Sequence, residues 1–347
     1  MACGTVAPMD VPVIDISAWV GATRTAPGSE LESARALAAE QLDRACRGTG
    51  AFLVAGHGLR PGLLDELEFA SREFFALDTE EKSLVSMDRG GRAWRGWFPL
   101  GGELTSGVPD HKEGIYFGRE LDRCDPRVAT GVPLHGPNLF PERPEALRGL
   151  VLEAMAALDT LGRALLAAMG SALGLGPDHF DRHVTRDPVV LMRVFHYPAV
   201  VDPEPSGGSW GVGEHTDYGL LTLLHQDHTG GLEVHTPRGW VEVDPVPGTL
   251  VCNLGDMLER MTAGRYRATP HRVRTPTQDR ISIPFFLDPS WDTELAELPL
   301  APEATASPAT RRRWDGTDLS ELRGTYGEYL VSKVSRVFPA LREDAGI

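Results

Sequence analysis

Three side chains in the second half of the sequence have the types and the order of a metal-binding set. His215 and Asp217 are separated by one residue, and residues i and i+2 of a strand point to the same side of a sheet. His271 follows 54 positions after Asp217. Two imidazoles and one carboxylate on one face leave three positions open on an octahedral metal, which is typical of non-haem Fe(II) sites. We therefore predict that His215, Asp217 and His271 bind iron and form the catalytic centre.

A His-x-Asp pair also arises by chance in a chain with 11 histidines and 49 acidic residues. A structural zinc site would favour four protein ligands, often cysteines. The chain has four cysteines, and none lies at a plausible spacing from this pair: Cys3, Cys46, Cys124 and Cys252. Zinc is therefore the weaker interpretation.

A guanidinium and a hydroxyl follow the second histidine. Arg280 comes nine residues after His271, and Ser282 is two residues further along, so both face one side if the segment is a strand. A guanidinium fork beside a hydroxyl suits a dicarboxylate such as 2-oxoglutarate. Taken alone, this would be an ordinary surface pair. Its place after the His-x-Asp pair and the later histidine makes it a candidate cosubstrate site.

Composition and charge limit the possible functions. The chain has 347 residues, of which 41% are hydrophobic and 24% charged, and these fractions are those of a globular protein. Thirty-four basic and 49 acidic residues give a net charge of −15, which disfavours generic binding to nucleic acid or to an anionic membrane. We therefore predict no nucleic-acid or membrane partner and make no prediction of the oligomeric state.

Cysteine usage and apolar patterning predict a cytoplasmic protein. Four cysteines without a CxxC pair do not make a disulfide scaffold. The N-terminus has neither the basic region nor the long apolar core of a signal peptide. The most apolar stretch, Ala154–Leu175, contains Asp159 and Arg163, so we predict a buried amphipathic helix there and no membrane span.

The first half of the chain is predicted to be rich in helices. The apolar run Val11–Ile16 predicts a strand, and glycines bracket a second strand at Ala51–Ala55. Ser29-x-x-Glu32 has the spacing of a capping box. Helices are predicted over Ser29–Cys46, Pro61–Leu77 and Glu145–Gly174.

The second half changes character. Between residues 189 and 286, short runs of Val, Leu, Thr and Phe alternate with Gly, Pro and Asp, which predicts an antiparallel sandwich or barrel. The tail is predicted to return to helix, with one apolar face formed by Leu319, Leu322, Tyr326, Leu330 and Val334. We therefore divide the chain into a helix-rich region (1–185) whose short strands contribute to the core, a β core (186–292) and a helical tail (293–347).

Several of these motifs occur in the order of a known family. The segments are Val11–Asp15, Gly50–Gly58, Gly213–Thr222, Asn253–Asp256 and His271–Val273. The chain resembles the Fe(II)/2-oxoglutarate-dependent dioxygenases of the isopenicillin N synthase-like superfamily over nearly its whole length. The resemblance implies an α+β fold whose core is a double-stranded β-helix, or distorted jelly roll. It also implies flanking N- and C-terminal helices and a metal at the open end of the core.

The resemblance implies roles for individual residues. His215, Asp217 and His271 match the iron ligands, while Arg280 and Ser282 match the pair that binds the distal carboxylate of 2-oxoglutarate.

The strand Met192–Pro198 matches the family strand that carries a further cosubstrate contact. Tyr197 matches that contact. Two residues earlier, relatives carry an Asn where this chain has Phe195. Arg193, on the same strand, is a candidate to replace the lost contact with the iron-side carboxylate.

Other segments resemble the bacterial ethylene-forming-enzyme branch of the family. They are Gly101–Thr105, His135–Asn138, Thr185–Asp187 and Arg336–Pro339. This likeness implies that four residues line the primary-substrate pocket: Glu103, Thr105, Tyr218 and Arg336. Phe286 is expected near the cosubstrate.

The predicted pocket offers one anion, one cation and two hydroxyls, which suit a polar, amino-acid-like substrate. In the alternative interpretation, Glu103 is a loop surface residue, Arg336 closes the C-terminal helix and Phe286 is ordinary core.

The resemblance implies an oxygenase that uses O2 and 2-oxoglutarate on a small polar or natural-product substrate and releases succinate and carbon dioxide. Hydroxylation is expected, and desaturation or cyclisation would use the same centre. Three alternatives remain open: an isopenicillin N synthase-type oxidase that needs no 2-oxoglutarate, formation of ethylene from 2-oxoglutarate, and a non-catalytic ligand-binding sandwich.

Overall fold

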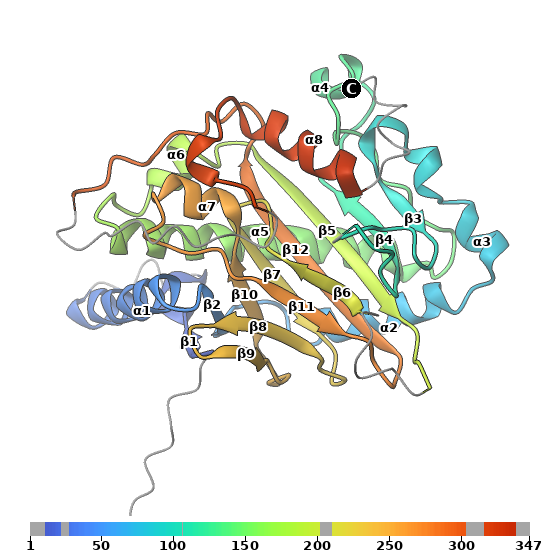
Figure 1. Cartoon of the computed structure of the whole chain (residues 1–347), viewed down its shortest axis with the longest axis horizontal. Helices are drawn as coiled ribbons and strands as arrows, with labels where there is room; N and C mark the ends of the chain where they lie inside the picture. Colours follow the sequence, from blue (N-terminus) through green and yellow to red (C-terminus); the bar gives the residue numbers. More distant parts are fainter. Residues whose placement is uncertain (1–10, 22–27, 106, 202–209, 303–315, 338–347) are drawn as a thin grey trace, which may run out of the picture.

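An eight-stranded sheet forms the larger layer of the computed structural model, which describes residues 11–21, 28–105, 107–201, 210–302 and 316–337. Its strands run in the order β1-β2-β10-β7-β12-β5-β4-β3 (Figure 1). All neighbouring pairs are antiparallel except β1 with β2. Their bounds are β1 Val13–Asp15, β2 Ala51–Ala55, β10 Leu250–Leu254, β7 Leu221–Gln226, β12 Arg280–Ser290, β5 Pro188–Tyr197, β4 Glu113–Gly118 and β3 Gly96–Phe98.

A four-stranded sheet forms the second layer, in the order β6-β11-β8-β9. Its strands are β6 Trp210–His215, β11 His271–Arg274, β8 Leu232–Thr236 and β9 Gly239–Glu242. The two sheets are the predicted jelly roll. Strands β1 to β4 come from the first half of the chain, so this region supplies both edges of the large sheet, β1-β2 at one and β4-β3 at the other, as well as helices.

Helices pack against the large sheet. The longest, α5 (Ala146–Ala172), packs against β7 and β12. The α-helices other than α5 are α1 Ser29–Arg47, α2 Leu63–Phe75, α3 Thr79–Ser83, α4 Pro126–Ala129, α6 His179–His183, α7 Asp256–Met261 and α8 Tyr326–Val337. None of the helices in the described ranges is long and apolar enough to cross a membrane.

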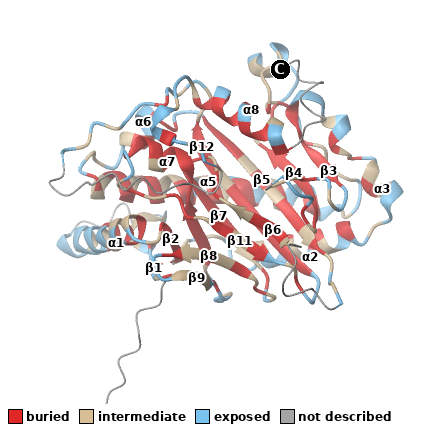
Figure 2. Ribbon diagram, viewed as in Figure 1, coloured by how far each residue is buried: buried red, intermediate tan, exposed pale blue. Residues whose placement is uncertain are grey.

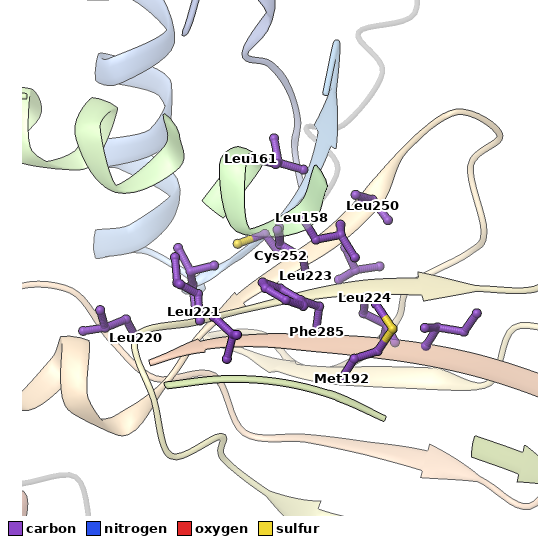
Figure 3. Packing of buried hydrophobic residues seen from close by; sticks show 14 of the residues in the cluster. Leu158, Leu161, Met192, Leu220, Leu221, Leu223, Leu224, Leu250, Cys252 and Phe285 are labelled. Carbon is purple, nitrogen blue, oxygen red and sulfur yellow. The ribbon is translucent and has the colours of Figure 1, made fainter. Parts of the chain in front are cut away.

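Successive residues of β12 face the hydrophobic core and a cavity in turn. Ile281, Ile283, Phe285 and Leu287 are fully buried, while the alternate residues line a cavity described below. Figure 3 shows Leu158 and Leu161 of α5 close to Leu223 and Phe285 of the sheet. A Cβ atom at Gly162 would lie 2.7 Å from Leu287, so glycine lets α5 approach the sheet closely. The central strands of the large sheet are buried along most of their length, whereas β9 at the edge of the small sheet has no buried residue (Figure 2).

The structure corrects two local predictions. Ser29 does not cap α1: the N-cap is Gly28, which makes no side-chain cap, and Ser29 is the first helical residue. The tail is not one helix from Leu319 onward. A 3-10 turn covers Leu319–Glu321, and α8 begins only at Tyr326, because Gly324 between them adopts a positive φ of 90° that breaks the helix.

Candidate metal centre

Antiparallel pairing brings the two predicted histidine ligands together. His215 is the last residue of β6, and His271 is the first of β11. They are register partners across the two strands, so the centroids of their rings lie 4.2 Å apart. Asp217 follows β6, and the three side chains offer ligand atoms within 4.8 Å of one another.

Each histidine presents its Nε2 atom to the carboxylate. The Nδ1 atoms lie 2.8 Å from the carbonyl oxygen of Gly213 for His215, and 2.9 Å from that of Thr269 for His271. An Nδ1–H that donates to these carbonyls leaves Nε2 as the metal-binding atom. The distances from Nε2 to Asp217 are 3.8 Å for His215, to Oδ1, and 3.8 Å for His271, to Oδ2.

Burial and neighbouring charges favour the protonation states that bind a metal. Burial, with a smaller contribution from His271, holds the pKa of His215 well below its usual range, so its imidazole is neutral. Burial alone would raise the pKa of Asp217, but the two histidines and its hydrogen bonds outweigh burial and lower the pKa. A neutral imidazole at His215 beside the carboxylate of Asp217 matches the donor set that a non-haem iron requires.

Two polar residues fix the carboxylate of Asp217, and neither has a predicted role. Asn253 Nδ2 donates to Oδ2 of Asp217 at 2.7 Å, and the hydroxyl of Thr222 donates to the same oxygen. Both residues lie in segments that resemble family motifs. Their convergence depends on the β7–β10 register, in which Asn253 and Thr222 are partners, and sequence patterning does not predict this register.

A cavity next to the three ligands lies between the two sheets. Strands β5, β7 and β12 line it from the large sheet, and β6, β8 and β11 from the small one. The contribution of β12 is Arg280, Ser282, Pro284, Phe286 and Asp288, and that of β5 is Leu191, Arg193, Phe195 and Tyr197.

The cavity holds a buried guanidinium with free donors. Arg280 is fully buried, and its Nε donates to the carbonyl of Gly230 at 2.7 Å. Within the described residues, its Nη1 and Nη2 atoms have no hydrogen-bond partner. Ser282 Oγ lies 3.4 Å from the hydroxyl of Tyr197, whose ring lies 4.8 Å from the guanidinium. Because buried donors without partners are costly, this group fits the distal carboxylate of 2-oxoglutarate.

A second cation, which the sequence did not single out, lies near Phe195. Lys112 is buried, lines the cavity and places its Nζ 4.7 Å from the centroid of the Phe195 ring. Arg193, the candidate for the lost Asn contact, also lines the cavity. Its Nη1 lies 3.3 Å from Glu103 Oε1, so Arg193 already forms an ion pair with a neighbouring acid.

Three of the four residues predicted for the substrate pocket line the cavity: Glu103, Thr105 and Tyr218. Phe286, which is expected near the cosubstrate, lines it as well. Glu103 is buried and is therefore not a loop surface residue.

Arg336 lies elsewhere: it is exposed on α8 and is not among the lining residues, whereas Leu330 and Val337 of the same helix are. Arg336 directly precedes Val337, and neighbouring helical positions are about 100° apart. Its guanidinium therefore does not share the cavity-facing side.

The comparisons with known proteins agree with this geometry. Residues 188–289 match a model of the 2OG-Fe(II) oxygenase superfamily, and residues 11–143 match the N-terminal model of non-haem dioxygenases in morphine synthesis. A probable iron/ascorbate oxidoreductase of Dictyostelium discoideum is 39% identical, over 96% of each chain. A homoarginine-6-hydroxylase of Glycine max is 35% identical, over 93% of this chain and 96% of its own.

Among solved structures, a full-length Neurospora crassa protein in complex with alpha-KG and 5-formyluracil is similar. It aligns with a TM-score of 0.74 and 25% identity, over 96% of this chain and 99% of that one.

Proposed function

Because the chain belongs to the 2OG-Fe(II) oxygenase superfamily, we propose that it hydroxylates a small, polar, amino-acid-like substrate. The chain is an enzyme, and its cofactors are Fe(II) and 2-oxoglutarate. The balanced reaction consumes one substrate C–H bond, O2 and 2-oxoglutarate, and it yields an alcohol, succinate and carbon dioxide. The observation that carries the proposal is a single cavity with the metal ligands, a carboxylate site and a cluster of charged side chains.

Different residues of this chain are assigned to the metal and to the cosubstrate. We assign iron to His215, Asp217 and His271, and the distal carboxylate of 2-oxoglutarate to Arg280 and Ser282, with Tyr197 beside them. Bound iron supplies the activation of O2 that is coupled to loss of carbon dioxide from 2-oxoglutarate. The side chains supply ligands, charge complementarity and exclusion of water.

The register of β12 lets us assign the two ends of the cavity to different ligands. Phe286 is the partner of Thr222, which bonds the ligand Asp217, so the metal centre lies near the level of Phe286. Arg280 and Ser282 precede Phe286 on this face, and Asp288 follows it. We therefore assign the end beyond Phe286 to the primary substrate.

Several polar residues line the cavity. Glu103, Thr105, Tyr218, Asp288 and Arg193 are among them, and we assign them to the substrate end. Such groups suit a substrate with charged or hydrogen-bonding functions. The similarity to a homoarginine-6-hydroxylase supports an amino-acid-like substrate for this chain.

The three cysteines in the described ranges are free, and this supports a cytoplasmic location.

Succinate release in the presence of candidate substrates tests the proposal. The enzyme is loaded with Fe(II) and 2-oxoglutarate and given a panel of amino acids in air. One member should stimulate succinate release and gain one oxygen atom by mass spectrometry. Turnover without 2-oxoglutarate would favour the oxidase, and ethylene in the headspace would favour fragmentation of 2-oxoglutarate. Stoichiometric iron binding with no turnover on any substrate would favour the non-catalytic sandwich.

A further inference from the structure

The predicted anion of the substrate pocket is already neutralised by the protein. Glu103 Oε2 lies 2.8 Å from Lys112 Nζ. Oε1 of Glu103 accepts hydrogen bonds from the hydroxyl of Tyr116 and from Arg193. Asp110 also bonds Lys112. Two acids therefore face two bases in this cluster. Glu103 Oε2 has no hydrogen-bond partner among the described residues, but its ion pair with Lys112 already balances the charge that a substrate cation would need.

A different acid in the cavity has a free oxygen. Asp288 is buried and lines the cavity. Its Oδ2 accepts a hydrogen bond of 2.6 Å from the hydroxyl of Tyr326. Its Oδ1 is also buried, and it has no hydrogen-bond partner in the part of the chain that the structure describes. A buried acceptor without a donor lowers stability, so this oxygen needs an explanation.

The position of Asp288 places that oxygen beside the metal centre. It lies on the same face of β12 as Arg280, eight residues further along, and Phe286 at the level of the metal lies between them. A Cβ atom at Gly219 would lie 1.6 Å from Asp288 Oδ1. The oxygen therefore occupies space that exists only because residue 219, two after the ligand Asp217, is glycine.

We propose that Asp288 Oδ1 is the acceptor for a cationic N–H group on the side chain of the primary substrate, an ammonium or a guanidinium. This inference rests on the proposed oxygenase function and narrows its substrate class. The same strand then presents complementary charges on the two sides of the metal. Arg280 takes the carboxylate of the cosubstrate, and Asp288 takes the cation of the substrate.

The electrostatics of Asp288 agree with this role. Burial raises its pKa to about 7, and the nearby Asp217 also raises it, while the Tyr326 hydrogen bond and Arg193 lower it. A cation bound beside this carboxyl group would lower its pKa and favour the ionised form. A purely structural acceptor for Tyr326 would need only one of the two oxygens.

A matched pair of amino acids tests the charge preference of the wild-type enzyme. L-Arginine and L-homoarginine are compared in the loaded enzyme with L-citrulline, which keeps the α-ammonium and α-carboxylate of arginine but has a neutral side chain. Succinate release and binding calorimetry are both measured. We expect stimulation and binding by a cationic amino acid and weaker binding of L-citrulline. Equal responses to L-arginine and L-citrulline would overturn the assignment, and this comparison needs no variant.

Two variants separate substrate binding from a structural role. Asp288→Asn replaces the free acceptor by a donor and keeps an oxygen for Tyr326, while Tyr326→Phe removes only the phenol hydroxyl. Asp288→Asn should weaken binding of the cationic amino acid about tenfold or more, the factor expected for a lost charge-assisted hydrogen bond. Its affinity for L-citrulline and its 2-oxoglutarate requirement should change little. Tyr326→Phe should lower the melting temperature and keep the charge preference.

The outcomes distinguish this inference from the proposed function. Unchanged affinity in Asp288→Asn, or equal losses in both variants, would overturn the role of Asp288 while the oxygenase assignment stands. Failure of every amino acid, cationic or neutral, to stimulate succinate release would overturn the proposed substrate class and this inference with it.

Discussion

Asn253 and Thr222 face each other across β10 and β7, and both donate a hydrogen bond to Oδ2 of the metal ligand Asp217. Two donors on one oxygen hold the plane of the carboxylate and leave Oδ1 free of these bonds. Hydrogen bonds of this kind orient a ligand and tune its basicity. The affinity for iron therefore depends on residues that do not bind the metal.

Asn253→Ala should weaken Fe(II) binding by about ten- to a hundredfold, the usual effect of losing a partner of a metal ligand. The measurement is the dissociation constant of Fe(II), or of Co(II) under anaerobic conditions. Thr222→Val serves as the matched variant, because it removes the other hydrogen bond at nearly constant volume. His271→Ala, which removes a ligand, should abolish both binding and turnover. Wild-type affinity in both Asn253→Ala and Thr222→Val would show that Asp217 needs no such support.

Arg280→Lys should raise the KM for 2-oxoglutarate by about tenfold or more. Lysine keeps the charge but lacks the planar fork that binds a carboxylate through two hydrogen bonds. The rate of succinate release is measured against 2-oxoglutarate concentration, with Fe(II) saturating. Arg274→Lys is the control, since Arg274 pairs with Glu233 and Glu242 on the small sheet and does not line the cavity. An unchanged 2-oxoglutarate requirement in Arg280→Lys would point to a different carboxylate site.

The metal ligands could be predicted from the sequence because their chemistry is local. His215 and Asp217 lie two residues apart, and the type and order of the later histidine complete the set. The roles of Lys112 and Asp288 could not be predicted in this way. Asp288 gains its importance from Gly219 on a distant turn, and Lys112 from its contacts with Glu103 and Asp110. A buried charge cluster has no period in the sequence, because its members come from loops and strands whose pairing is unknown.

The elements of the fold could likewise be predicted only where their sequence signal is local. Helix α1 and strand β2 agree with prediction to within one residue, because the first is a long periodic segment and the second is bracketed by glycines. The tail reads as one helix in the sequence because its apolar positions keep helical spacing. The positive φ of Gly324 breaks it, and a single glycine does not reveal its φ. The two-sheet order also depends on pairings between strands far apart in the chain.

Glu113 should stabilise the fold at neutral pH and lose this effect in acid. Burial alone would raise its pKa, but hydrogen bonds from His196, Lys82 and Trp97 outweigh burial and lower it. A folded-state pKa below the unfolded value of about 4.5 gives stability that is present above that pH and lost as the pH falls.

Glu113→Gln should therefore lower the free energy of unfolding by about 1–3 kcal/mol at pH 7. The difference from wild type should shrink below about pH 4.5. Urea unfolding of both proteins at pH 7, 5 and 4 measures this. A difference that is the same at every pH would mean that the charge of Glu113 does not contribute.

Glu103→Gln and Arg336→Ala should have opposite outcomes, although the family likeness assigns both residues to the substrate pocket. Glu103 is buried in the cluster with Lys112 and Arg193, so the loss of its charge leaves Asp110 to balance two buried cations. Glu103→Gln should lower stability by about 1–3 kcal/mol and reduce the amount of product formed per succinate released.

Arg336 is exposed and does not line the cavity. Arg336→Ala should therefore stay within about 0.5 kcal/mol of wild type with unchanged coupling. The ratio of product to succinate, measured with the same substrate for both variants, decides the matter. A lowered ratio in Arg336→Ala would show that the C-terminal helix contributes to the substrate site. An unchanged ratio in Glu103→Gln would show that its charge cluster only stabilises the fold.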